Sequence, residues 1–99
     1  MIVFDKTNKI VFDEKDNYIL KDNEKELKCT GWTDKLGQLI YERDIIINHI
    51  GIELVVYYNN YNNSFEAFKN GFGDSYITEE YINNSMKIGY NTNNNFNIK

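Results

Sequence analysis

The chain has 99 residues, of which 41% are hydrophobic and 15% aromatic, a composition typical of one small globular domain with a modest core. Its 15 acidic and 11 basic residues give a net charge of −4, which argues against duplex nucleic acid as a partner because such proteins usually carry a basic patch. The single cysteine excludes an intramolecular disulfide, no apolar run reaches the ~20 residues of a membrane span, and the start Met1–Asp5 lacks the features of a signal peptide. We therefore expect a cytoplasmic protein that does not contact a membrane.

Short apolar segments separated by polar turns open the chain. Ile2–Phe4 and Lys9–Phe12 flank Asp5–Asn8, whose Asp and Asn side chains favour a turn. Two further short strands are predicted at Tyr18–Leu20 and Glu26–Cys29, separated by a polar segment that is typical of a solvated loop. Residues 1–28 are therefore expected to form N-terminal hairpins that pack on the rest of the chain or serve as an oligomerisation arm.

The middle of the chain carries the strongest strand signals. Asp34–Gly37 predicts a turn in which Gly37 supplies a positive φ, and Gln38–Tyr41 returns as a strand. After a turn at Glu42-Arg43, apolar strands are predicted from Asp44 to about His49 and over Ile52–Tyr58. Their near-continuous apolar runs indicate strands that are buried on both faces, or buried on one face and covered by a partner subunit on the other.

The last third of the chain adds strands and one ambiguous segment. Ser64–Lys69 and Met86–Tyr90 predict strands, and the residues between them include a glycine loop at Asn70–Asp74. Within Ser75–Ile82, Thr78 followed by two glutamates is typical of a helix start, so we expect at most one short helical turn near 78–84. Many short strands with regular turns predict a mainly β protein built as a small barrel or roll.

The segment Cys29–Ile46 reads CTGWTDKLGQLIYERDII and resembles the "TGLKDKNGKEIYEGDIV" signature of YopX-like proteins of bacteriophages and prophages. Phe4–Lys9 is similar to the "WDKxNK" start of that family, and Lys87–Phe96 resembles its closing "VIGNIYENPEL" without the proline. The resemblance implies a single YopX-like domain over residues 1–99, with a small β-roll of the Src-homology type over residues 29–99. It implies a phage or prophage origin and a bacterial host cytoplasm, and it implies no particular activity.

Two residues depart from this signature. Trp32 stands where the family usually has Leu, and it either fills a larger core pocket or stacks on a ligand. Arg43 stands where the family usually has Gly; if that glycine has a positive φ, Arg costs about 1–2 kcal/mol there, and Arg43→Gly is expected to stabilise the fold. Alternatively, Arg43 contacts a phosphate or carboxylate, or pairs at the surface with Glu42 or Asp44.

The sequence predicts no catalytic residue, metal site or cofactor. Cys29 is expected to be a buried strand residue, and nothing places the single histidine, His49, beside it as a catalytic partner. Nothing in the sequence marks Glu42 or Asp44 as the buried acid of a catalytic pair, and Asp44 fits a turn residue that accepts backbone hydrogen bonds. Because ligand spacing for a metal and a phosphate-binding loop are also lacking, we expect a protein that is not an enzyme.

The aromatic side chains have two alternative roles, which are packing in the core and binding of a ligand. Most of the rings between Trp32 and Tyr76 are needed to build the core of so small a domain. Small barrels also bind single-stranded nucleic acid by stacking bases on exposed rings. The candidate binding residues selected on this basis are Trp32, Tyr41, Arg43, Tyr57 and Phe72.

The leading interpretation is a non-enzymatic, phage-associated binding or assembly protein that forms a homo-oligomer. Its apolar strands around Ile45–Ile47 and Leu54–Tyr58 are more extensive than one small core conceals, and self-association would cover them. One alternative is an acidic inhibitor of a host protein, such as a defence nuclease with a basic groove. Another is a module that binds single-stranded nucleic acid or a nucleotide, and in neither alternative is an enzymatic activity implied.

Overall fold

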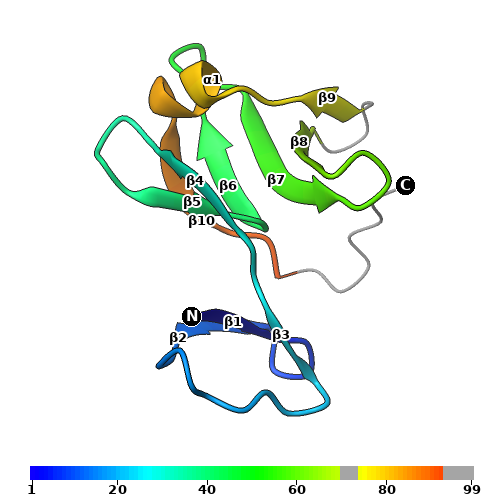
Figure 1. The fold of residues 1–99 in the computed structure, drawn as a ribbon. Helices are drawn as coiled ribbons and strands as arrows, with labels where there is room; N and C mark the ends of the chain where they lie inside the picture. Colours follow the sequence, from blue (N-terminus) through cyan, green and yellow to red (C-terminus); the bar gives the residue numbers. More distant parts are fainter. Residues whose placement is uncertain (70–73, 93–99) are drawn as a thin grey trace.

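The computed structural model describes residues 1–69 and 74–92, and in these residues the protein is mainly β. They form antiparallel strands in three sheets and one short helix (Figure 1). The strands of the described residues form no closed barrel, because each sheet has two edges. The mainly β class and the single helical turn predicted from the sequence are confirmed.

A three-stranded sheet lies at one end of the molecule (Figure 1). The two predicted N-terminal strands are present as β1 (Ile2–Asp5) and β2 (Ile10–Asp13), which pair as a hairpin. The third strand, β3 (Glu24–Glu26), pairs with the other side of β1. The order β2-β1-β3 places β1 in the centre, where both Val3 and Phe4 are fully buried.

The strand predicted at Tyr18–Leu20 is absent. In place of the strand predicted over Glu26–Cys29, β3 begins at Glu24, inside the segment predicted as a loop, and ends at Glu26. The Tyr18 hydroxyl donates a hydrogen bond to Oε1 of Glu24 (2.8 Å), and its ring lies edge-on to Phe12. Ile19, in contrast, is 85% exposed. Tyr18 therefore anchors a loop. The prediction of a strand here was wrong, because three consecutive apolar residues need not form a strand of a sheet.

The β1–β2 turn is organised by the Asp5 carboxylate. Its Oδ1 accepts hydrogen bonds from the backbone N–H groups of Thr7 (2.9 Å) and Asn8 (3.0 Å), and from Nδ2 of Asn23 (2.9 Å). The first two bonds are the turn chemistry expected of an aspartate. The third ties the turn to the segment that leads into β3, so one carboxylate holds all three strands together.

The main body contains a five-stranded sheet and a two-stranded hairpin. The hairpin consists of β4 (Cys29–Thr33) and β5 (Leu39–Tyr41). The sheet has the order β10-β6-β7-β8-β9. Its strands are β6 (Asp44–Ile47), β7 (Glu53–Asn59), β8 (Ser64–Phe68), β9 (Asp74–Tyr76) and β10 (Met86–Tyr90).

The core lies between this hairpin, one face of the sheet and the helix. Trp32 of β4 packs against the buried cluster together with other half-buried apolar residues. The apolar runs of β6 and β7 are central in the sheet, which explains why the sequence there is nearly continuous in hydrophobic residues. The fully buried members of the cluster come from five segments: Ile40, Ile46, Val56, Ala67 and Ile82.

The helix α1 (Glu79–Asn83) is the predicted helical turn. The Thr78 side chain accepts a hydrogen bond from the backbone N–H of Tyr81 (3.1 Å), as an N-cap does, and two glutamates occupy the first turn. Ile82 points into the core and is fully buried. The helix is therefore a short plug over one side of the core.

The β4–β5 turn connects to the edge strand β10. Gly37 has a φ of 80°, as predicted, and Asp34 is 4% exposed. The Asp34 carboxylate accepts bonds from the backbone N–H groups of Leu36 (3.0 Å) and Gln38 (2.8 Å). Its Oδ2 also accepts a bond from the backbone N–H of Lys87 (3.0 Å), so the turn is fixed beside the start of β10.

Candidate functional site

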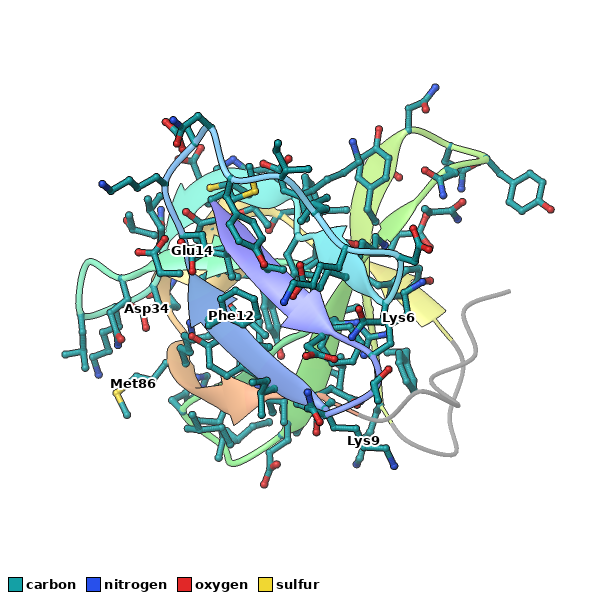
Figure 2. All side chains as sticks on the ribbon, turned by 90° about the horizontal axis from the view of Figure 1, so that it is seen from below. Lys6, Lys9, Phe12, Glu14, Asp34 and Met86 are labelled. Carbon is teal, nitrogen blue, oxygen red and sulfur yellow. The ribbon has the colours of Figure 1, made fainter. Side chains whose placement is uncertain are left out.

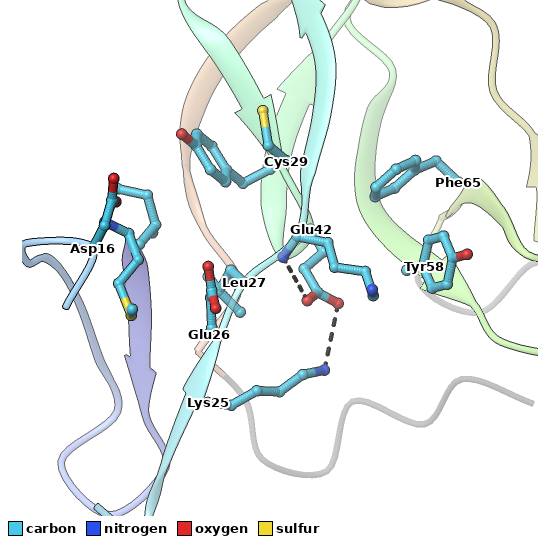
Figure 3. Close-up of a pocket in the computed structure, with 12 residues that line it drawn as sticks. Asp16, Lys25, Glu26, Leu27, Cys29, Glu42, Tyr58 and Phe65 are labelled. Atoms are coloured by element: carbon cyan, nitrogen blue, oxygen red, sulfur yellow. Dashed lines mark hydrogen bonds and ion pairs between the residues drawn. The ribbon is translucent and has the colours of Figure 1, made fainter. Parts of the chain in front are cut away.

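A cleft of about 640 Å³ lies where the three-stranded sheet meets the main body, along the connection from β3 to β4 (Figure 3). Its volume is in the range of small-molecule sites. Charged, aromatic and apolar side chains from both parts of the protein line it. The lining residues are Met1, Ile2, Asp16, Lys25, Glu26, Leu27, Lys28, Cys29, Tyr41, Glu42, Tyr58 and Phe65.

Glu42 organises the centre of the cleft. Only 5% of this residue is exposed, and its Oε1 accepts a hydrogen bond from the backbone N–H of Lys28 (2.8 Å). In return, the Glu42 N–H donates to the Lys28 carbonyl (2.9 Å). Oε2 lies 3.4 Å from Nζ of Lys25 (Figure 3). One buried carboxylate therefore fixes the backbone of one lysine and the ammonium group of another.

An aromatic wall forms one side of the cleft. The rings of Tyr58 and Phe65, which pair across β7 and β8, meet edge-to-face with centroids 5.0 Å apart. Phe65 also meets Trp32 edge-to-face at 6.4 Å, and Trp32 packs against the core. Trp32 therefore supports the aromatic wall on the side that faces the core. Nζ of Lys28 lies 4.8 Å from the centroid of the Tyr58 ring, within cation–π range.

Cys29 lies on the rim of the cleft and is exposed, which contradicts the expectation of a buried strand residue. In β4 the exposed and half-buried residues alternate, so Thr30 and Trp32 face inward while Cys29 faces outward. Its Sγ accepts a hydrogen bond from the backbone N–H of Gly31 (3.3 Å). Across the strand pair, burial and the neighbouring Cys29 raise the pKa of Tyr41.

Glu42 and Asp44 are both buried, although no sequence pattern marked them so. Asp44 is fully buried, and its Oδ2 accepts a bond from the Tyr41 N–H (2.8 Å), as the sequence predicted for a turn residue. Its Oδ1 accepts no hydrogen bond from the described residues but forms an ion pair with Nζ of Lys87 (3.3 Å). Burial raises the pKa of Asp44, while the Tyr41 N–H and Lys87 act in the opposite direction. These contacts are those of a structural pair.

Glu66 is a third buried acid whose oxygens are engaged. Oε1 accepts a hydrogen bond from the Tyr57 hydroxyl (2.8 Å), and Oε2 accepts bonds from the side-chain amides of Asn59 and Asn62 (both 3.1 Å). Burial acts to raise the pKa of Glu66, but these bonds outweigh it and lower the pKa overall. The group holds the β7–β8 turn in place.

The candidate residues selected from the sequence do not gather at one site. Tyr41 lines the cleft, and Trp32 stands behind its aromatic wall. Tyr57 is 1% exposed and bonded to Glu66, so its ring belongs to the packing of the sheet. Arg43 lies at the junction of the two parts of the protein, against Phe4. Phe72 lies outside the described residues.

Sequence reasoning overlooked the charged half of the cleft. Lys25 was assigned to a solvated loop, and Lys28 was not considered. The two lysines reach Glu42 across 17 and 14 positions of sequence, and no local pattern signals such contacts. Tyr58 and Phe65 were recognised only as members of the general aromatic group.

A second cleft of about 460 Å³ lies between α1 and the β6–β7 turn and includes His49. Its polar groups bond one another. Oδ1 of Asn48 accepts the N–H groups of Ile50 (3.1 Å) and Ile52 (2.9 Å), and Nδ2 of Asn48 donates to the Tyr81 hydroxyl (3.1 Å). These bonds indicate that the cleft is formed by the packing of the β6–β7 turn against the helix.

Within residues 1–69 and 74–92, no group of three or more His, Cys, Asp or Glu side chains is arranged to hold a metal ion. None of the helical structure in that part of the chain has the length and apolar character to cross a membrane. Comparison of the chain with family models, with curated proteins and with solved structures finds no match. The geometry of the cleft and of the exposed surface therefore carries the functional assignment.

Proposed function

We propose that this protein is a non-enzymatic binding or assembly protein of the YopX-like family of phages and prophages, and that it acts as a homo-oligomer. The backbone at Arg43 supports the family resemblance. This residue occupies a position where the YopX-like signature has Gly, and its φ is 73°. A positive φ is the conformation for which glycine is favoured. The β4–β5 hairpin packed against an open five-stranded sheet is compatible with the proposed Src-homology-type β-roll.

The observation that carries the assembly proposal is a group of exposed apolar side chains on the edge strand β10. Met86, Ile88 and Tyr90 of this strand are 37%, 50% and 40% exposed. A register shift between Lys87 and Gly89 interrupts the regular alternation of the strand, and Nζ of Lys87 lies 4.2 Å from the centroid of the Tyr90 ring. Figure 2 shows Met86 pointing away from the body, on the side of the molecule where Asp34 lies. The β4–β5 turn, fixed to β10 through Asp34, adds Leu36 (68% exposed) and Leu39 (47% exposed).

A second copy of this chain is the occupant that fits this apolar surface. None of its five members is charged, and the residues next to Leu36, Met86 and Ile88 in the sequence include the cationic Lys35 and Lys87, which offset part of the repulsion between two copies of a protein of net charge −4. A two-fold contact would bring the same patch of each copy together. Because Asp34 occupies the outward N–H of Lys87, contact through side chains is favoured over strand addition at this point.

The test is size-exclusion chromatography with light scattering over a range of protein concentrations. We expect the wild-type chain to form a dimer and Ile88→Lys to be monomeric with an unchanged circular dichroism spectrum. Ile19→Lys is the matched control, because Ile19 is more exposed but belongs to the loop between β2 and β3 and is not a member of the patch. A wild-type monomer, or a dimer that survives Ile88→Lys, would overturn the proposal; a monomer would favour the alternative of a host protein as the partner.

A further inference from the structure

We propose that the lysine–aromatic side of the cleft, defined by Lys25, Lys28, Tyr58 and Phe65, is a binding site for a mononucleotide. In this site the base stacks on the aromatic wall and the phosphate lies between the two ammonium groups. The cleft is formed within one chain, and none of its lining residues belongs to the β10 patch. The proposal therefore stands or falls independently of self-association.

The wall offers a rigid aromatic surface for a planar ligand. The Tyr58–Phe65 pair is held at 5.0 Å between centroids, and Trp32 supports Phe65 from the core side. Rings fixed before binding stack on a base without further loss of side-chain freedom. Lys28 Nζ already lies 4.8 Å from the Tyr58 ring, so a base on this wall would have an ammonium group beside it.

The two lysines supply the anion-binding part. Lys25 belongs to β3 and Lys28 lies three residues later, on the connection to β4; Glu42 fixes the backbone of Lys28 and the ammonium group of Lys25. With two ammonium groups and one carboxylate, this side of the cleft has a net positive charge. The Lys25 side chain is 53% exposed, so its ammonium group can contact a phosphate while it remains near Glu42.

The other acidic residues of the cleft lie apart from this site. In Figure 3, Asp16 and Glu26 lie on the opposite side of the β3–β4 connection from Tyr58 and Phe65. A phosphate bound between the lysines would therefore face away from them. A long polyanion would extend over a surface whose overall charge is −4, and this favours a single nucleotide over a nucleic acid strand.

The experiment is a calorimetric and ¹H–¹⁵N NMR titration of the full chain at low salt with AMP and dTMP. Adenosine and inorganic phosphate are titrated separately to measure how strongly the nucleoside and the phosphate bind alone. Oligo(dT) tests whether a nucleic acid strand binds through the same base and phosphate contacts. We expect both mononucleotides to bind and to shift the backbone signals of Lys25–Cys29 and Tyr58. Each half-ligand should bind at least about tenfold more weakly.

Matched variants assign the site. Lys28→Gln and Tyr58→Leu should each weaken AMP binding about tenfold. Lys35→Gln and Tyr61→Leu make the same changes at exposed positions outside the cleft and should leave binding unchanged. The proposal is overturned if AMP does not bind, if the shifts map elsewhere, or if the control variants weaken binding as much as the cleft variants. It is also overturned if oligo(dT) binds with a strong salt dependence while mononucleotides do not.

Discussion

The guanidinium carbon of Arg43 lies 4.0 Å from the centroid of the Phe4 ring. This contact joins the main body to the three-stranded sheet, because Phe4 is fully buried in the central strand β1. Nη1 of Arg43 also donates to the carbonyl of Asn91 (3.0 Å), and the backbone N–H of Arg43 donates to the carbonyl of Val56 (2.7 Å). One residue in a left-handed conformation thus connects three segments of the chain.

Arg43 has two opposing effects on stability, and substitutions separate them. The positive φ costs about 1–2 kcal/mol, while the stacking contact and the hydrogen bond to Asn91 together contribute about 1.5–2 kcal/mol. We therefore expect Arg43→Gly to leave the free energy of unfolding within about 1 kcal/mol of the wild type, rather than to stabilise the fold as backbone reasoning alone suggested. Urea denaturation measures this difference.

Arg43→Ala is the control, because alanine keeps the unfavourable φ and loses the guanidinium. It should be less stable than Arg43→Gly by about 1 kcal/mol. If the Ala and Gly variants are equally stable, the backbone at this position is not strained, and the account of Arg43 fails.

Asp44→Ala should strongly destabilise the protein. It removes the acceptor of the Tyr41 N–H and the charge partner of Lys87, and removing one member of a buried pair costs about 3–5 kcal/mol. Asp44→Asn retains an acceptor for Tyr41, and Lys87 keeps its hydrogen bond to the Tyr90 hydroxyl (3.2 Å). We expect Asn to cost about 1–2 kcal/mol in urea denaturation, clearly less than Ala. If the two variants lose equal stability, the charge of Asp44 holds the β5–β6 turn, and the hydrogen bond that Asp44 accepts from Tyr41 does not.

Asp5 should make the stability of the N-terminal sheet sensitive to acid. The hydrogen bonds from Asn8, first of all from its backbone N–H, lower the pKa of Asp5 below 3.8. A carboxylate with a lowered pKa in the folded state contributes stability that is present above its unfolded pKa and is lost as the pH falls through its folded pKa. Thermal melts between about pH 6 and about pH 2 should therefore show a smaller loss of stability for Asp5→Asn than for the wild type.

Asp13→Asn is the matched control for this experiment, because Asp13 is an exposed aspartate of the same sheet. It should follow the wild-type pH dependence closely. If Asp5→Asn loses as much stability in acid as the wild type, another carboxylate governs the acid response of this sheet.

The local features of the fold could be predicted from the sequence because single residues determine them. Gly37 and the Asp34 side chain specify the β4–β5 turn, and Thr78 specifies the start of α1. The longest strands, β6 and β7, carry apolar runs that match their central place in the sheet. These signals act over a few positions and are largely independent of the rest of the chain.

The candidate site could not be predicted, because contacts between distant segments create it. Lys25 belongs to β3, a strand of charged residues that forms only because β1 provides a partner edge. Lys28 and Glu42 come together because they extend the antiparallel β4–β5 pairing by one residue beyond the Cys29–Tyr41 pair. The exposure of Cys29 follows from the alternation of β4, which depends on which face of the hairpin meets the core.

Native mass spectrometry of the chain, purified from bacterial cytoplasm without denaturation, tests the account most directly. If the protein assembles with itself, the spectrum should show a discrete dimer, and Ile88→Lys should convert this dimer to a monomer. If the cleft holds its ligand through purification, each subunit also carries the extra mass of one nucleotide, and Lys28→Gln removes that mass without dissociating the dimer. A bare monomer at every protein concentration would contradict the central claim that this chain assembles with itself.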